Sequence, residues 1–314
     1  MARSSNQTER DAARRLFFLL NRHCRLAIRQ AVMLKPHVIA IVTWHGSFIA
    51  KAYRSLAAAR RQAWLLGTLR RAGFFAAPAV VPIGHGGVIT AGGRYWLLTE
   101  YVADARPLSF ANEPDISDGL QVLNGYHLAT ARIVYGEQAS MWLPSVQLYE
   151  KWRRRYDEFF RHLPFIETVM EKEDISFTLR WAHYCLETCR EHAQELAAES
   201  VAIIHGDVAA HNFLRTAAGH VYMIDYDTAA LASPGLDYWQ YANRILPHLD
   251  WSYSALTRFA PLRRWLEKHW FLHALLFPAD VFREWRPAVA RRRPLALDRE
   301  KRERFVRRLC AMLK

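Results

Sequence analysis

The chain has 314 residues, of which 51% are hydrophobic, 13% aromatic and 23% charged. This composition excludes a disordered chain, and the length allows one large domain or two lobes with a hydrophobic core. No apolar run reaches the roughly 18 residues of a membrane-spanning helix. The run Leu16–Leu20 is too short for the core of a signal peptide, and the four cysteines form no CxxC pair and no zinc-binding spacing. We therefore expect a soluble cytoplasmic protein with reduced thiols.

The net charge of +13 is concentrated in the first hundred residues. Residues 12–99 contain 13 lysine and arginine residues and no aspartate or glutamate, whereas the charges of residues 100–314 sum to zero. A basic excess of this kind first suggests a polyanion-binding protein. No recognised nucleic-acid motif accompanies it, so nucleic acid is not the expected partner. Nucleic-acid binding that weakens steeply as the salt concentration rises would instead indicate such a partner.

The first hundred residues predict a helix, a three-stranded meander, a second helix and a hairpin. Helical patterns cover residues 8–24 and 55–72, and Gly73 marks the end of the second. The Gly92-Gly93 pair predicts a tight turn. The predicted strands are Leu26–Met33, His37–Trp44, Ser47–Tyr53, Val88–Thr90 and Tyr95–Tyr101.

The pattern changes after Val102, where long helical segments replace strands. The predicted helices of this part are Asp118–Tyr135, Leu148–Leu163 and Ile175–Glu199, with further helices from Leu236 onward. Only Val201–Ile204, Phe213–Leu214 and Val221–Ile224 read as strands. The sequence thus predicts an α+β protein with a small antiparallel β-rich lobe over residues 1–102 and a larger, mainly helical lobe over 103–314. The linker is expected at residues 101–107.

The densest chemical signal lies between residues 205 and 227. His205-Gly206-Asp207 follows an apolar run, Asn212 comes five residues after Asp207, and Asp225 comes thirteen residues after Asn212. Phosphoryl transfer needs a carboxylate that takes the proton of the acceptor hydroxyl. It also needs an amide oxygen and a second carboxylate that hold Mg²⁺. The competing interpretation is a turn rich in Asp and Asn between strands.

These residues resemble the aminoglycoside phosphotransferase/choline kinase branch of the protein-kinase-like fold, and more narrowly the spore-coat CotS-type kinases. The stretches that carry the resemblance are GGRYWLLTEYV, IIHGDVAAHNFL, VYMIDYDTAALASPGLDYWQY and FLHALLFPADVFREW, spread over most of residues 40–290. The resemblance implies a bilobal protein-kinase-like fold and an ATP- and Mg²⁺-dependent transfer of the γ-phosphate to a hydroxyl. The implied acceptor is a small molecule or a glycan. A sporulation setting, deposition in the spore coat and coat-protein partners are implied as well.

The resemblance also implies roles for the residues of the motif. Asp207 would be the catalytic base, and Asn212 and Asp225 would be the metal ligands. His205 would brace the loop, and Asp237 would be a structural carboxylate that ties the loop down.

The resemblance implies roles in nucleotide binding as well. Lys51 would be the strand lysine that reaches the phosphates, and the backbone of Glu100, Tyr101 and Val102 would pair with adenine. A lone strand lysine is otherwise a solvated side chain, and Asp227 could touch the metal or cap the following turn.

Two features depart from the pattern of a standard kinase. The loop around Pro36 contains no glycine, although glycine lets backbone N–H groups approach phosphates. The acid-free stretch also contains no glutamate to pair with Lys51, and Gln62 is the nearest polar substitute. Lys51 could instead pair with Asp225, or only with the nucleotide. The alternative function is therefore a catalytically weak or inactive kinase-fold scaffold protein of the spore coat.

Overall fold

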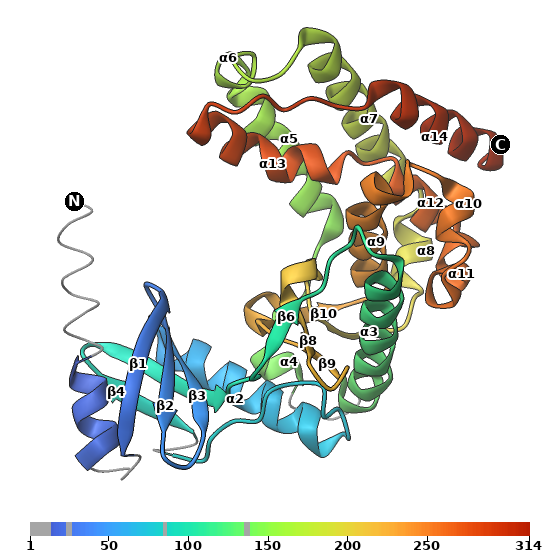
Figure 1. Ribbon diagram of the computed structural model, residues 1–314. Helices are drawn as coiled ribbons and strands as arrows, with labels where there is room; N and C mark the ends of the chain where they lie inside the picture. Colours follow the sequence, from blue (N-terminus) through green and yellow to red (C-terminus); the bar gives the residue numbers. More distant parts are fainter. Residues whose placement is uncertain (1–13, 23–26, 84–86, 135–138) are drawn as a thin grey trace. The chain divides into compact units, whose positions relative to one another are not determined.

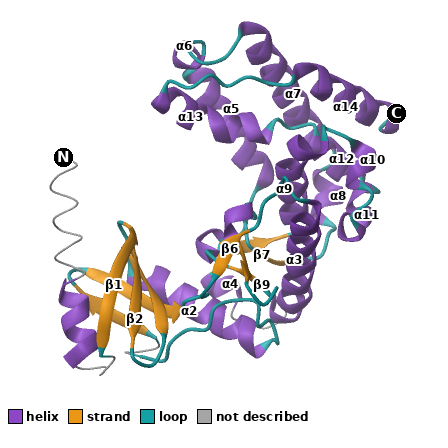
Figure 2. Ribbon diagram, in the orientation of Figure 1, coloured by secondary structure: helices purple, strands orange, loops and turns teal. Residues whose placement is uncertain are grey.

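The computed structural model describes residues 14–22, 27–83, 87–134 and 139–314 (Figure 1). The fold is mixed α+β, as predicted, with an antiparallel sheet in the N-terminal region and mainly helices in the C-terminal part (Figure 2). The chain forms two compact units. The first unit comprises Met1–Leu108, Leu128–Leu143 and His211–Asp227, and the second comprises Ser109–His127, Pro144–Ala210 and Thr228–Lys314. The lobe division at residue 102 stays a prediction.

A five-stranded antiparallel sheet forms the main part of the first unit. Its strands, in the spatial order β1-β2-β3-β5-β4, are β1 (Ile28–Lys35), β2 (Val38–Thr43), β3 (Ser47–Tyr53), β5 (Arg94–Glu100) and β4 (Val88–Ala91). The pairing of β1 with β2 and of β2 with β3 confirms the predicted meander. Gly92 and Gly93, with φ of 60° and 69°, form the tight turn between β4 and β5. Both residues lie in the left-handed region that glycine adopts without steric cost.

One face of this sheet is covered by the first helical segment. Residues 14–22 are helical, and the remainder of the helix predicted over 8–24 lies outside the described residues. Leu16 and Leu20 are four residues apart, so they lie on one helix face and pack into a buried cluster with Ile39, Ile41 and Trp96. This cluster is the hydrophobic core beneath the sheet.

Helix α2 (Leu56–Arg71) contacts β3, β4 and β5. It begins at Ser55, whose hydroxyl accepts a hydrogen bond from the Ala58 N–H at 3.2 Å, and it ends just before Gly73, as predicted. Because Leu65, Leu66 and Leu69 are buried, the helix is fixed by its apolar face. The same face carries Gln62, which is 4% exposed.

A second, three-stranded sheet completes the first unit, in the order β6 (Ala105–Pro107), β8 (Phe213–Thr216) and β9 (Val221–Met223). The last three residues of the segment 101–107, where the linker is expected, form β6 and pair with β8. The Met223 N–H donates to the Ala76 carbonyl at 2.7 Å. The small sheet is thereby tied to the segment that follows α2.

The second unit is mainly helical and also contains a two-stranded sheet, β7 (Ala202–Ile204) with β10 (Ala230–Ala232). Its longer helices are α5 (Leu148–Arg161), α7 (Lys172–Glu191), α9 (Gly235–Ile245), α13 (Ala279–Arg291) and α14 (Arg299–Met312). The shorter helices are α6 (Leu163–Ile166), α8 (Ala193–Ala197), α10 (Tyr253–Leu256), α11 (Ala260–Leu266) and α12 (His269–Leu275). Helix α3 (Glu113–Val134) contributes residues to both units, and α4 (Ala139–Trp142) belongs to the first.

Aromatic side chains form much of the second core. Trp239, Trp265, Trp270 and Trp285 are buried, whereas Trp251 is only half-buried. None of the helices in the described ranges is long and apolar enough to cross a lipid bilayer.

Candidate functional site

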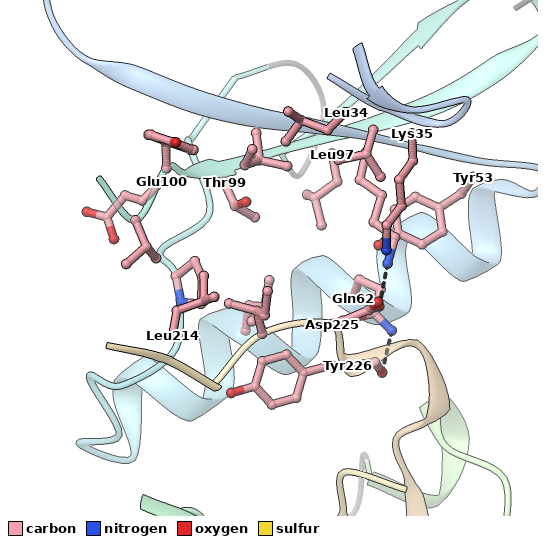
Figure 3. Close-up of a pocket in the computed structure, with 18 residues that line it drawn as sticks. Leu34, Lys35, Tyr53, Gln62, Leu97, Thr99, Glu100, Leu214, Asp225 and Tyr226 are labelled. Atoms are coloured by element: carbon pink, nitrogen blue, oxygen red, sulfur yellow. Dashed lines mark hydrogen bonds and ion pairs between the residues drawn. The ribbon is translucent and has the colours of Figure 1, made fainter. Parts of the chain in front are cut away.

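A pocket of about 270 Å³ lies within the first unit (Figure 3). Its walls include apolar side chains of three strands, among them Val38, Ile49 and Leu97. Glu100, Tyr101 and Val102 line it too, as do residues 224–226, which follow β9. An apolar cavity with a few charged groups at one end suits a ligand that has a flat apolar part and an anionic part.

Lys51 lies at the charged end of this pocket. Its Nζ is 2.6 Å from Asp225 Oδ1 and 2.7 Å from Asp227 Oδ2, and only 18% of its side chain is exposed. The lysine is therefore held between two carboxylates, and its pairing with Asp225 confirms the alternative considered from the sequence. Both aspartates stay partly exposed, at 38% and 44%.

Tyr53 adds a third contact to this group. Its hydroxyl donates to Asp227 Oδ1 at 3.3 Å. Burial, reinforced by the charges of Asp227 and Asp225, raises the pKa of Tyr53 far above its ordinary value. The tyrosine therefore stays neutral and serves as a hydrogen-bond donor.

Gln62 does not take the place of the missing glutamate. Its Nε2 donates to the Tyr226 carbonyl at 2.9 Å, and Figure 3 shows the amide turned toward Tyr226. Gln62 therefore fixes the backbone directly after Asp225 from the buried face of α2. It acts on the aspartate segment and makes no contact with Lys51 in the described part of the chain.

Asp225 has a left-handed backbone, with φ of 66°. This region is uncommon for residues with a side chain, and aspartate is among those that tolerate it. The Ile224 N–H donates to the Asn212 carbonyl at 2.9 Å, and Asn212 is 2% exposed. These contacts tie the buried Asn212 to the residue that precedes Asp225.

The backbone N–H groups of Glu100, Tyr101 and Val102, which are expected to pair with adenine, differ in their hydrogen bonds. The Glu100 N–H donates to the Ala79 carbonyl at 2.9 Å, and the Tyr101 N–H donates to the Ser47 carbonyl at 3.1 Å. No partner for the Val102 N–H is found within the described residues. Val102 is therefore the residue of the three whose N–H is available to a ligand.

In the second unit, Asp237 organises the loop that carries Asp207. Asp237 Oδ2 accepts from the His205 N–H at 2.7 Å, and Oδ1 accepts from the Gly206 N–H at 2.9 Å. His205 is fully buried, and its Nδ1 accepts from the Asp207 N–H at 3.3 Å. Gly206 has φ of 77°, and an added Cβ would lie 2.5 Å from the Thr228 carbonyl oxygen, so only glycine fits there.

The charge of Asp237 is balanced inside the second unit. Burial alone raises the pKa of this carboxyl, but the contact with His127, at 3.2 Å, and the Gly206 N–H together lower it below its ordinary value. Asp237 is thus an ionised, fully buried carboxylate. Its structural role in the reaction loop stays a prediction.

Sequence reasoning missed the residues of α9 that face Asp207. Arg244 Nη2 lies 2.5 Å from Asp207 Oδ1, and Gln240 Oε1 accepts from the Val208 N–H at 2.8 Å while its Nε2 donates to the Gly206 carbonyl. Gln240 and Arg244 follow Asp237 by three and seven residues. These intervals repeat on one helix face, so the spacing from Asp237 could have identified both.

The predicted residues thus fall into two groups. Lys51, Glu100–Val102, Asn212 and Asp225 belong to the first unit, and His205, Asp207 and Asp237 belong to the second. Within the described ranges, no three His, Cys, Asp or Glu side chains form a metal site by themselves. An amide oxygen with one or two carboxylates fits Mg²⁺ nonetheless, because this ion takes its remaining ligands from phosphates and water.

Comparisons with known proteins identify the family and the fold of the chain. Residues 35–259 match the model of the phosphotransferase enzyme family. No curated protein matches the chain significantly. Among solved structures, an aminoglycoside phosphotransferase from Alicyclobacillus acidocaldarius is 19% identical, with a TM-score of 0.69 over 92% of this chain and 93% of that one.

Two further structures show the same fold at lower identity. The AMP-bound spectinomycin phosphotransferase APH(9)-Ia is 14% identical, with a TM-score of 0.62 over 94% of both chains. The choline kinase LicA from Streptococcus pneumoniae is 12% identical, with a TM-score of 0.56 over 95% of this chain and 99% of that one. The chain therefore has a kinase-like fold and belongs to the phosphotransferase enzyme family.

Proposed function

We propose that this phosphotransferase moves the γ-phosphate of ATP, with Mg²⁺, to a hydroxyl group of a small molecule or glycan. The observation that supports the proposal is the clamp of Lys51 between Asp225 and Asp227, at the end of the pocket lined by Glu100–Val102. A strand lysine beside metal-binding carboxylates is the arrangement with which kinases bind a nucleotide triphosphate. Structures similar to this chain contain AMP, ADP or GDP.

The residues that line the pocket of the first unit would bind the nucleotide. The adenine ring would lie between apolar walls such as Ile49 and Leu97. It would accept a hydrogen bond from the Val102 N–H. Lys51 would turn from the carboxylates toward the phosphates. Asp225 and Asn212 would then hold Mg²⁺, which offsets the phosphate charge as the bond to the leaving group breaks.

On the acceptor side, Asp207 has the role of the general base. Its carboxylate takes the proton of the acceptor hydroxyl while the hydroxyl oxygen forms a bond to the γ-phosphorus. The bond between that phosphorus and the β–γ bridging oxygen breaks, and ADP leaves with the electron pair. The Arg244 contact and the bonds of Asp237 to the loop hold the base in position.

The test is ADP formation by wild type and by Asp207→Asn over a panel of aminoglycosides, choline, sugars and sugar acids. We expect the substitution to lower turnover by about 10²- to 10⁴-fold, the usual contribution of a general base. Equal rates in the two proteins would remove Asp207 from the mechanism.

A nucleotide-binding control separates the enzyme from the scaffold. We expect ATP to raise the Tm of both proteins only when Mg²⁺ is present. A wild-type protein that shows no response to ATP, GTP or Mg²⁺ would support the alternative of a kinase-fold scaffold.

We also propose a place for this activity in the spore coat. The proposal rests on the similarity of IIHGDVAAHNFL and the neighbouring stretches to CotS-type kinases. It would make a coat glycan the acceptor and coat proteins the partners. Isolated spore coats tested for the chain with a specific antibody would decide this point, since absence from coat and forespore alike would contradict it.

A further inference from the structure

The surroundings of Asp207 within the second unit are basic. Arg244 pairs with Asp207 and is only 16% exposed, and its Nε has no hydrogen-bond partner among the described residues. The Asp207 carboxylate therefore satisfies one side of this guanidinium. A buried N–H group without a partner is costly, so the unsatisfied side is suited to an added anion.

Helix α5 supplies two more cations. Lys151 and Arg155 lie one turn apart, so their charges share a helix face, and both side chains are partly buried. Neither has a carboxylate within 4 Å in the described part of the chain, although carboxylates pair with several arginines elsewhere in this unit. Like charges at this spacing destabilise a helix, and burial without a partner adds to the cost.

A fourth cation comes from α13, which contacts both α5 and α9 (Figure 1). Arg283 projects from this helix, and its Nε is 3.2 Å from Glu284 Oε1. Burial, followed by the charge of Arg283, lowers the pKa of both Arg155 and Arg244. We name Lys151, Arg155, Arg244 and Arg283 the basic cluster.

Asp207 and Glu284 are the carboxylates that act on Arg244, and Asp207 acts on Lys151 as well. Asp237 also acts on Lys151, but it is already occupied by His127 and two backbone N–H groups. The second unit thus holds partly desolvated positive charge beside the residue proposed to activate the acceptor.

We propose that the basic cluster binds the acceptor through an anionic group, so that the acceptor is a hydroxyl compound carrying a carboxylate or a phosphate. This inference deepens the proposed function and rests on it. The anion would neutralise Lys151 and Arg155 and accept hydrogen bonds from guanidinium groups, which match carboxylate and phosphate geometry. The hydroxyl of the same molecule would then be presented to Asp207. A cationic acceptor, such as an aminoglycoside or choline, would be repelled by the same charges.

The first test measures anion binding without turnover. The probe is inorganic sulfate, added to protein whose nucleotide site is saturated with Mg²⁺-ADP. Three proteins are compared by thermal denaturation: wild type, the double variant Lys151→Gln/Arg155→Gln, and the control Arg154→Gln. Arg154 is an exposed neighbour on the same helix, and its Nε donates to the Glu150 carbonyl.

Sulfate at ten times its Kd is expected to raise the Tm of wild type and of Arg154→Gln by about 3 °C. The double variant should lose most of that rise. Without sulfate its Tm should equal or exceed that of wild type, because the repulsion between two unpaired cations is gone. A double variant that responds to sulfate as wild type does would overturn the proposal.

The second test identifies the acceptor class from ADP formation with glucose, glucosamine, glucuronate and glucose 6-phosphate. We expect at least a tenfold preference in kcat/KM for one of the two anionic sugars over glucose, and the lowest value for glucosamine. Glucuronate or glucose 6-phosphate as the better substrate distinguishes a carboxylate from a phosphate ligand. A preference for glucosamine would overturn the anionic acceptor while leaving the phosphotransferase proposal intact. Absence of turnover with every acceptor would count against the phosphotransferase proposal, and the sulfate response would still decide whether the basic cluster binds anions.

Discussion

In each unit, the charges around the candidate functional residue are opposite in sign to the net charge of the stretch of sequence that contains it. Residues 12–99 contain no carboxylate, yet Lys51, which comes from that stretch, is held between two aspartates. Residues 100–282 carry 16 basic and 24 acidic side chains, yet Asp207, within that stretch, has cations around it. The net charge of a segment therefore does not give the charge around a site within it, because the fold decides which charged side chains meet.

Sequence separation explains the contrast. Lys51 and Asp225 are 174 residues apart, and the bond exists because β3 and the segment after β9 belong to the same unit. In the second unit, α5, α9 and α13 each contribute cations to one place.

The largest effect is expected for Lys51→Met. The substitution leaves Asp225 and Asp227 without their shared cation and removes the proposed phosphate ligand, so turnover should fall on the order of 100-fold. The measurement is kcat/KM for ATP with any acceptor that supports turnover. Lys35→Met is the matched control, because Lys35 also lines the pocket but is exposed and has no ion pair among the described residues. Similar losses in both variants would show that the clamp has no special role.

Asp237→Ala should cause the largest loss of stability. It leaves the His205 and Gly206 N–H groups and His127 without their buried partner, which should lower the free energy of unfolding by about 3 to 5 kcal/mol. Urea denaturation followed by circular dichroism measures this loss. Asp298→Ala, at an exposed helix N-cap, should cost clearly less. Equal losses would mean that the loop does not depend on Asp237.

Gln62→Glu tests whether the first unit needs the acid that its sequence lacks. The amide that donates to the Tyr226 carbonyl would be replaced by a buried carboxylate that cannot donate. The variant should lose about 1 to 3 kcal/mol of stability and gain no activity. Gln62→Met removes the hydrogen bond without adding charge and should lose less at neutral pH. A Gln62→Glu protein that is as stable as wild type and turns over faster would show that Lys51 exchanges its aspartates for the new glutamate.

The smallest effect concerns His273, a half-buried base of the second unit. Burial, followed by the charges of His192 and His269, lowers the pKa of His273 to about 4, from an ordinary 6.5. The unfolded chain therefore binds a proton below pH 6.5 while the folded protein does not, so stability falls as the pH drops from 6.5 toward 4. His273→Gln should flatten the pH dependence of Tm in that window. An unchanged slope would show that His273 does not stay neutral in the folded protein.

Much of the fold could be predicted because it depends on local patterns. The alternation of buried residues in β2, the apolar face of α2 and the Gly92-Gly93 turn are each set by residues close together in the chain. The short strand β6 was missed because three residues give too little periodicity, and its pairing partner β8 lies about a hundred residues away. Helix α3 begins at Glu113, five residues before its predicted start, since its first turn is marked by acids rather than by apolar spacing.

The amino-acid sequence sets the chemical inventory of this protein. The motif from His205 to Asp227 defines an aspartate, an amide and further carboxylates at fixed spacing, and the acid-free stretch rules out a local partner for Lys51. Only the tertiary structure decided the pairings: Lys51 with Asp225 and Asp227, Gln62 with the Tyr226 carbonyl, and Asp207 with Arg244. The physical reason is that a charge acts over a few ångströms of space whatever the distance along the chain.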